Sequence, residues 1–524
     1  MRYFLIRLIR GMVSVFVAMC IIIILLFFVL DKNLIFSEDE QYIKLSNNQK
    51  ITYMYTMWQK YGYLTRVTYP EYLTELVKEG KMDDEYRKSV ATIGRTPDKD
   101  SEDTAKWVAE FTKYYEGKGY TIQRLDAVMA NSKRVANGGE ASLFAYRNTP
   151  VLPRVVNFFK SLLQFDTIHY VPADHDIGER GLIFTLHDPA YGGEKFSPAI
   201  MGNGTYHKYL LYFDKGFPWL RQNFVKLRLG TSFTVNKGVD AFDTMTQAQG
   251  TYVPHTVYYP SGDVEVSADD IHTATYLYGS RALNLVYADK YVDDYTNTGL
   301  TKDSHSKMFY SFIISILASF FTYLLGLPLG ILMAKKKDTW VDSLGNAYVI
   351  FMIAVPSLAY YFMFKGLAIK AGLPVIFSLD NPTALMYITP VAASLAASVA
   401  GTMKWMRRYM VDQMNSDYVK FARAEGLSEL EIFAKHIFKN AAIPITHGIP
   451  NTIIMALTGS IMMERLFAIP GVGGLLVQAI QAYDNSVILG VAFFYGFLSI
   501  IGSILGDITM SIMDPRISYS SKAR

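Results

Sequence analysis

The chain has little cysteine: Cys20 is the only one among its 524 residues. An intramolecular disulfide is therefore impossible, and any folded domain must be held together by its own core. No GxxxxGK[ST] sequence occurs, so the chain has no Walker A site for ATP. No GxSxG elbow, HExxH or Ser/Lys constellation is visible, which leaves a hydrolase without support. Internal repeats and low-complexity tracts are absent as well.

Metal and nucleic-acid signals are also poor. The spacing of His169, Asp174, His175 and Asp176 matches no standard zinc or calcium pattern. Exposed turns are often built from Asp and His, so we expect no metal site there. The net charge of +4 comes from basic clusters beside apolar runs and gives no reason to expect nucleic-acid binding.

Charged residues are scarce, at 19%, whereas apolar residues make up 51% of the chain. Runs near the ~20 residues that cross a bilayer recur at the N-terminus and in the last part of the chain. Six are read, at 9–30, 308–333, 348–364, 383–403, 445–467 and 487–513. Pro356 and Pro390 interrupt the third and fourth, which is tolerated where neighbouring helices satisfy the freed carbonyls. The pattern predicts a polytopic α-helical membrane protein with six transmembrane helices.

Basic residues predict the orientation of these spans. They cluster before the first run, after the second, after the fourth and after the sixth: Arg2, Arg7 and Arg10; Lys335 to Lys337; Lys404, Arg407 and Arg408; Arg516, Lys522 and Arg524. With six spans all four clusters lie on one side, which the positive-inside rule makes cytoplasmic. We therefore expect a multi-pass protein of a bacterial plasma membrane with both termini in the cytoplasm.

The first run is not expected to be a cleaved signal. It is too long for a signal h-region, and no small-residue cleavage site follows it. Apolar residues continue after Cys20, whereas a lipobox cysteine would end such a run. Lipidation at Cys20 is therefore not expected.

A large mixed α/β extracellular domain is expected between the first and second helices. Residues 71–116 are typical of amphipathic helix, and residues 231–291 alternate in short apolar runs typical of strands. The expected division is 1–32 for the N-terminus and first helix, 33–307 for the external domain, 308–514 for a five-helix core and 515–524 for a cytoplasmic tail.

A charged insert at 417–444 separates two apolar runs, with the sequence DYVKFARAEGLSELEIFAKHIFKNAAIP. Asn415 or Ser416 suits a helix N-cap, and Gly426 suits a helix end because it enters the left-handed region without a Cβ penalty. Ser428 followed by Glu431 is a capping box that begins a second helix. That helix is expected to present an apolar stripe of Leu430, Phe433, Ile437 and Phe438.

The words ARAEGLSE, KHIFKN and AAIP resemble the EAA loop of ABC-importer permeases of the oligopeptide and dipeptide families. The resemblance implies a coupling loop, within 404–444, that inserts into a groove of an ATPase subunit. The residues implied are Ala422, Arg423, Ala424, Glu425, Gly426 and Leu427. Glu425 departs from the family, where a basic residue is usual. The alternative is an ordinary amphipathic cytoplasmic loop.

Three further stretches resemble the same family. LTGSIMMERLFAIPGVGGLL, at 457–476, resembles a span that ends in Glu, an aromatic residue and PGxGxL. The implied lining of the translocation path is Glu464, Phe467, Pro470, Gly471 and Gly473, with a plain external turn as the alternative. Residues 229–233 resemble an external turn, and Asp514-Pro515-Arg516 resembles a terminal signature. Asp507 lies inside the last run, and we expect it to pair with a nearby Arg or a helix end.

The resemblance implies the fold of an ABC type I importer permease. The expected function is that of a transmembrane permease subunit of an ATP-driven oligopeptide importer, which forms the path and couples to ATPase subunits. The implied partners are a second, homologous permease in a heterodimer, two ABC ATPase subunits, an extracellular substrate-binding lipoprotein and the peptide. The chain itself is expected to be no enzyme and to bind no cofactor, with ATP and Mg used by the ATPases.

Two alternatives remain open at this point. One is the same class of permease with another cargo, such as a dipeptide, nickel or another small solute. The other is a membrane sensor or adhesin, a class that needs no coupling loop.

Overall fold

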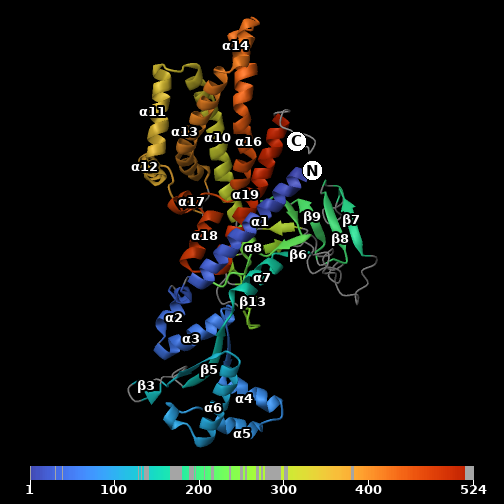
Figure 1. Ribbon diagram of the computed structural model, residues 1–524, viewed down its shortest axis with the longest axis vertical. Helices are drawn as coiled ribbons and strands as arrows, with labels where there is room; N and C mark the ends of the chain where they lie inside the picture. Colours follow the sequence, from blue (N-terminus) through green and yellow to red (C-terminus); the bar gives the residue numbers. More distant parts are fainter. Residues whose placement is uncertain are drawn as a thin grey trace.

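The structure is a computed structural model. It describes residues 2–29, 31–37, 39–45, 47–127, 129–130, 133–134, 141–165, 180–187, 194, 196, 198–205, 207–213, 217–234, 238–247, 252–253, 256–266, 271–272, 275–277, 297–299, 305–378 and 383–513. The molecule is elongated, with a bundle of long helices towards one end of its long axis (Figure 1). Helix α14 lies at that end, and helices α4 to α6 lie at the opposite end.

The end opposite α14 is a small α/β unit, here called the distal lobe. It contains strands β1 (Leu64–Thr68), β2 (Thr121–Leu125) and β5 (Ser142–Asn148), and helices α4 (Tyr69–Lys78), α5 (Asp84–Val90) and α6 (Glu102–Gly117). The strands form an antiparallel sheet in the order β1-β5-β2. Helix α4 begins in a complete capping box between Thr68 and Glu71. Residues 71–116 therefore form three helices, where the sequence indicated amphipathic helix.

The core of the distal lobe is rich in aromatic residues. Tyr69, Phe111 and Tyr115 are buried, and the ring centroids of Phe111 and Tyr115 lie 4.9 Å apart. Tyr69 also donates a hydrogen bond to the carbonyl of Val90. Such large buried rings supply much apolar contact for a lobe that has no disulfide. Short elements precede it: η2 (Lys32–Phe36), α2 (Glu40–Lys44) and α3 (Asn47–Lys60). Others lie within it: η3 (Pro97–Lys99), β3 (Met129–Ala130) and β4 (Lys133–Arg134).

A second unit, the proximal lobe, lies beside the end of the helical bundle that is opposite α14 (Figure 1). Its main sheet has the order β10-β9-β8-β7, and β6 pairs with β11. The elements are α7 (Val151–Ser161), β6 (Leu163–Phe165), β7 (Gly181–Thr185), β8 (Ala199–Asn203), β9 (Tyr209–Phe213), β10 (Leu220–Gln222), β11 (Val225–Leu227) and α8 (Ala241–Thr246). Short strands follow: β12 (Tyr252–Val253), β13 (Thr256–Tyr258), β14 (Val264–Val266), β15 (Ile271–His272), β16 (Thr275–Leu277) and β17 (Asn297–Gly299). The sequence prediction of strands within 231–291 is confirmed for β12 to β16, but it is wrong for 241–246, which form α8.

The helical bundle contains the long apolar helices. They are α1 (Arg2–Ile24) with its π-helical end η1 (Leu25–Val29), α10 (Lys307–Lys335), α11 (Trp340–Ala354), α12 (Ser357–Lys370), η6 (Ala384–Tyr387), α13 (Ile388–Met414), α16 (Lys439–Met455), α17 (Ile461–Phe467), α18 (Val472–Gln481) and α19 (Asn485–Met513). Between α13 and α16 lie α14 (Asp417–Ala424), α15 (Glu429–Glu431) and the π-helical η7 (Ile432–Phe438).

Glycines allow close packing of two helix pairs in the bundle. Helix α10 packs along α13, where a Cβ at Gly330 would lie 2.9 Å from the carbonyl oxygen of Met403. Helix α16 packs along α19, where a Cβ at Gly506 would lie 2.7 Å from the carbonyl oxygen of His447. Small residues at such crossings are typical of helix association in membranes, because they let the backbones approach.

Two of the six predicted spans differ from the structure. By length and composition, the described residues hold four helices able to cross a membrane, or six if each of two bent pairs counts as one span. The third predicted span is the pair α11 and α12, which bend by 105° at Pro356. The fifth breaks after α16, and its end forms a second bent pair, α17 and α18, at 86°. Hydropathy alone missed this break because the residues around it are apolar.

Candidate functional site

The predicted coupling segment is a helical knob, defined here as α14, α15 and η7. Ser416 is the N-cap residue of α14, but its side chain makes no capping hydrogen bond. The helix ends before Gly426, whose φ of +82° is the left-handed conformation expected from the sequence. The side chain of Ser428 accepts the N–H of Glu431, as in a capping box. The carboxylate of Glu431 pairs instead with Lys435, so only half of the box forms.

One side of the knob is buried against the bundle. Val419, Ala422, Ile432 and Ile437 are buried in a cluster with Met406 and Met410 of α13 and Ala334 of α10. This anchoring ties the knob to two long helices. The knob is therefore closely packed on the bundle and does not hang from it as a loose loop.

The other side of the knob is exposed and partly apolar. Phe421 is 69% exposed and Leu430 is 76% exposed. Between them Arg423 donates to Glu429 at 2.8 Å, and this hydrogen bond lowers the pKa of the Glu429 carboxyl. The exposed side of the knob thus presents large apolar side chains together with an ion pair.

The predicted apolar stripe of the second helix is only partly correct. Ile437 is buried, but Leu430 points outward and Phe438 is 37% exposed. The π-helical turn η7 explains the difference, because it adds a residue per turn and rotates the residues before it relative to those after it. No regular 3.6-residue pattern predicts that shift.

The predicted path residues surround the bend between α17 and α18. Glu464 is 2% exposed, and its carboxylate accepts the hydroxyl of Ser311 at 2.7 Å and the N–H of Gly474 at 2.9 Å. Ser311 in turn accepts the N–H of Val472 at 2.9 Å. This network joins α10 to both arms of the bend, and it satisfies a carboxylate that would be costly to bury alone.

Glycines are required around the Glu464 carboxylate. A Cβ at Gly471 or at Gly459 would overlap it, and a Cβ at Gly473 would lie 3.1 Å from it. Phe467 and Gly471 are buried and Pro470 is half-buried. Ala468 ends α17 in the left-handed conformation, with φ of 53°. The five predicted residues are thus brought together, and in this conformation they face the protein interior.

A carboxylate joint, not predicted from the sequence, connects the proximal lobe to α19. It consists of residues 229–234 held by Asp240 and Asp484. Asp240 accepts the N–H groups of Leu229 and Gly230 at 3.1 Å each and caps α8 through the N–H of Phe242. Burial raises the pKa of Asp240 to about 6, against the backbone hydrogen bonds that lower it.

Asp484 holds the other half of the joint. One of its oxygens accepts the hydroxyls of Ser232 at 2.7 Å and Thr234 at 2.9 Å, and the N–H groups of Phe233 and Thr234. Nearby, the amide of Asn485 donates to Tyr63 at 2.7 Å. The turn resembling an external segment at 229–233 is therefore the place where the proximal lobe meets the last long helix.

Asp507 pairs with an arginine, as expected from the sequence. It is 4% exposed, forms an ion pair with Arg7 of α1 and lies 3.3 Å from His447 of α16. A second buried acid, Asp342 of α11, receives two hydrogen bonds from Arg407 of α13, at 2.5 and 2.6 Å. These pairs join helices at the knob end of the bundle.

The two predicted sets of site residues are far apart in the molecule. Figure 1 shows α14 at one end, with α17 and α18 near the lobes. Among the described residues no group of three or more acidic, His or Cys side chains could hold a metal ion. The segment His169 to Asp176 lies outside the described residues, as do Asp514 to Arg516 and the predicted tail.

Comparison with known proteins identifies the family. Over 529 residues the chain is 33% identical to the oligopeptide transport system permease protein AmiC of Streptococcus pneumoniae serotype 4, with 99% of each chain covered. The chain belongs to the oligopeptide permeases of ABC importers. Residues 326–519 of this permease also match the family described as binding-protein-dependent transport system inner membrane component.

Other relatives match a smaller part of the permease. A putative peptide transport system permease protein of Brucella abortus is 31% identical over 215 residues, which cover 39% of this chain and 68% of that one. The dipeptide transport system permease protein DppB of Bacillus subtilis is 29% identical over 213 residues, 40% of this chain and 68% of that one. The pneumococcal relative therefore matches through the lobes, whereas these two match over about two fifths of the chain.

Proposed function

We propose that this chain is one of the transmembrane subunits through which an ATP-driven importer moves oligopeptides into the cell. The observation that carries the proposal is the helical knob, exposed at Phe421 and Leu430 and packed on α10 and α13. Membership of the family supports this knob as the contact for an ATPase. A sensor or adhesin would have no use for it.

The partners follow from this role. The chain pairs with a second, homologous permease, and two ATPase subunits bind the knobs from the cytoplasm. ATP and Mg are held by those subunits, and the chain has no catalytic role of its own. Ala422 anchors the knob, whereas Arg423, Ala424, Glu425 and Gly426 are exposed to the ATPase groove, with Leu427 half-buried beneath them. Both termini and the knob are cytoplasmic, and six spans result if each bent pair crosses once.

The bend at Glu464 closes the outer end of the path. Its buried network fixes the angle between α17 and α18, so the five residues around it line the path only when the bundle rearranges. Alternating access requires two discrete packings of this kind. The lobes, on the outer side, receive the peptide-loaded binding lipoprotein.

The test is peptide uptake by cells with a variant of the knob. In Gly426→Val a β-branched residue must adopt φ of +82°, which costs on the order of 1–3 kcal/mol. Uptake and peptide-stimulated ATP hydrolysis should fall, with less effect from Gly426→Asn because Asn tolerates this conformation. Gly117→Val is the matched control, since no atom lies within 4 Å of a Cβ there and its φ is not positive.

Normal uptake by Gly426→Val at a normal amount of protein would contradict the coupling role. Purification in mild detergent should also recover a second permease and two ATPases with this chain. A dipeptide is the second candidate cargo, because a dipeptide permease is among the relatives. Competition of labelled oligopeptide uptake by dipeptides separates the two cargoes.

A further inference from the structure

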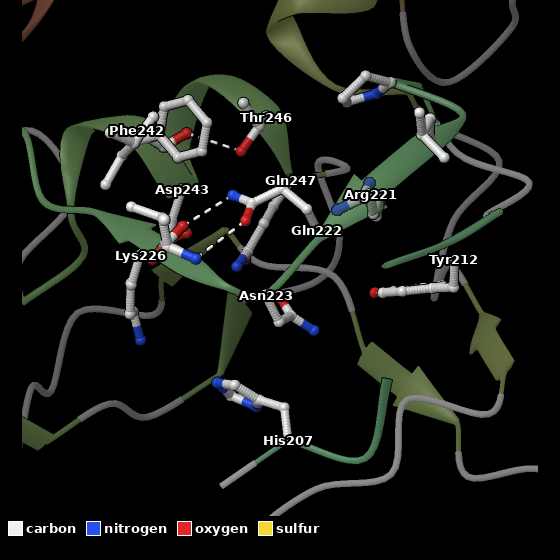
Figure 2. Close-up of a pocket in the computed structure, with 14 residues that line it drawn as sticks. His207, Tyr212, Arg221, Gln222, Asn223, Lys226, Phe242, Asp243, Thr246 and Gln247 are labelled. Carbon is white, nitrogen blue, oxygen red and sulfur yellow. Dashed lines mark hydrogen bonds between the residues drawn. The ribbon is translucent and has the colours of Figure 1, made fainter. Parts of the chain in front are cut away.

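A cavity of about 220 Å³ lies in the proximal lobe, between the main sheet and α8. Figure 2 shows Arg221 and Tyr212 on one side of it and Asp243, Phe242 and Thr246 on the other. Gln222 and Lys226 are exposed, so they mark its mouth. Ligand pockets for drug-sized molecules are larger, about 300–1,000 Å³, so this cavity fits an end of a chain rather than a whole ligand.

The walls of the cavity are preformed. The side chain of Gln222 donates to the carbonyl of Val225 at 2.7 Å and accepts its N–H at 3.0 Å, which fixes the turn from β10 to β11. Asn223 donates to the carbonyl of Tyr209 at 2.8 Å. On the opposite wall, the hydroxyl of Thr246 donates to the carbonyl of Phe242 at 2.8 Å. A preformed site loses less entropy when a ligand binds.

The cavity carries both signs of charge. Arg221 supplies a planar guanidinium, which suits a carboxylate, and Asp243 supplies an acceptor for N–H groups. The carboxylate of Asp243 disfavours a free anion such as phosphate. A peptide end offers a carboxylate together with backbone N–H groups, and Leu220 and Leu227 offer apolar contact for a side chain.

The position of the cavity also favours binding of the transported peptide. The face of α8 that turns away from it is buried: Ala241 and Met245 pack in one core with Val472 of α18 and Val491 of α19. Phe242 lines the cavity and also contacts the ring of Phe494, with centroids 6.3 Å apart. Only helix α8 therefore separates the cavity from α18 and α19 at the outer end of the bundle.

We propose that this cavity is an entry subsite that binds the C-terminal end of a peptide, with Arg221 holding the carboxylate. The inference rests on the proposed function, because it places the cargo on the outer side. A peptide released by the binding protein is held here before the outer end of the path opens.

The test is equilibrium binding of labelled tetra-alanine to the purified complex of the full chain, its partner permease and the ATPases, without the binding protein. Arg221→Gln should weaken binding about tenfold, the effect of losing one charge-assisted hydrogen bond. Arg221→Lys should restore part of the affinity. The C-terminal amide of the same peptide should be a poor competitor for binding to the wild-type complex. Its own affinity should be nearly the same for the wild-type and Arg221→Gln complexes.

The matched control is Arg228→Gln. Arg228 is exposed in the same lobe and donates to Gln164 at 3.1 Å, but it does not line the cavity. No saturable binding by the wild-type complex, equal loss with Arg228→Gln, or equal competition by acid and amide would each overturn the subsite. Peptide uptake by wild-type cells is measured separately, so a chain that transports peptide but fails this test refutes the subsite alone.

Discussion

The carboxylate joint predicts the effect of a single-atom change, Asp484→Asn. One oxygen of Asp484 accepts four hydrogen bonds, two from hydroxyls and two from backbone N–H groups. Its other oxygen accepts the N–H of Val487 at 3.3 Å. An amide must turn its NH₂ group towards one of these two sets of donors. Whichever way it turns, a donor faces a donor and the charge is lost.

The expected cost is about 3 kcal/mol, because hydrogen bonds to a charged group are worth roughly 1.5–3 kcal/mol each and do not add fully. Since 1.4 kcal/mol is a factor of ten, local opening of residues 229–234 should become roughly a hundredfold more frequent. Amide hydrogen exchange at Phe233 and Thr234, in the detergent-purified chain, measures that opening directly.

The matched control is Glu79→Gln in the distal lobe. It removes the carboxylate of an ion pair with Lys81, which contributes little because both side chains are exposed to solvent. Exchange at Phe233 should not change in this variant. If Asp484→Asn also left exchange in residues 229–234 unchanged, the joint would not be what holds the proximal lobe to α19.

Three other measurements address separate parts of the chain. Gly471→Ala should lower the free energy of unfolding by the roughly 1–3 kcal/mol typical of overpacking, because its Cβ would overlap the Glu464 carboxylate. Gly474→Ala should have little effect, since the atom nearest to its Cβ is 3.5 Å away. Equal loss of stability in both variants would refute the network. The pKa of Asp240 is raised from 3.8 to about 6 in the folded protein, so the stability that this residue contributes is present at low pH and is lost as the pH rises through 6. About 1.4 kcal/mol of the free energy of unfolding should be lost between pH 5 and pH 7.5. Asp240→Asn should remove that part of the pH dependence. Parallel pH profiles of stability in the two proteins would contradict this. Single cysteines at Ser101 and Ser261, with Cys20→Ala, should react with an impermeant reagent in intact cells, and one at Ser428 only after permeabilisation; the reverse pattern would invert the orientation.

The sequence was a good guide where one local rule decides the structure. Long apolar runs gave α10 and α19 almost to the residue, and Gly426 has the positive φ that a helix end favours. Asp507 finds an arginine because an unpaired carboxylate inside a span is too costly.

Prediction failed where distant residues decide together. The bend at Glu464 depends on Ser311, 153 residues away, and the joint pairs Asp484 with Ser232, 252 residues away. In the sequence Glu464 is an isolated acidic residue in an apolar run. Only the neighbouring glycines, such as Gly471 and Gly473, indicate that its carboxylate could be buried. The exposure of Leu430 depends on the π-helical turn η7, for which the sequence holds no recognised signal.

The distal lobe enters and leaves the rest of the chain at one place. Leu64 pairs with Asn148, and the N–H of Thr149 donates to the carbonyl of Tyr63 at 3.0 Å. The residues of its aromatic core all lie between these two points. A tight turn could join Tyr63 to Thr149 without moving either flank. The lobe thus has the geometry of an insertion: its chain enters and leaves at neighbouring residues, and its aromatic core is complete between them.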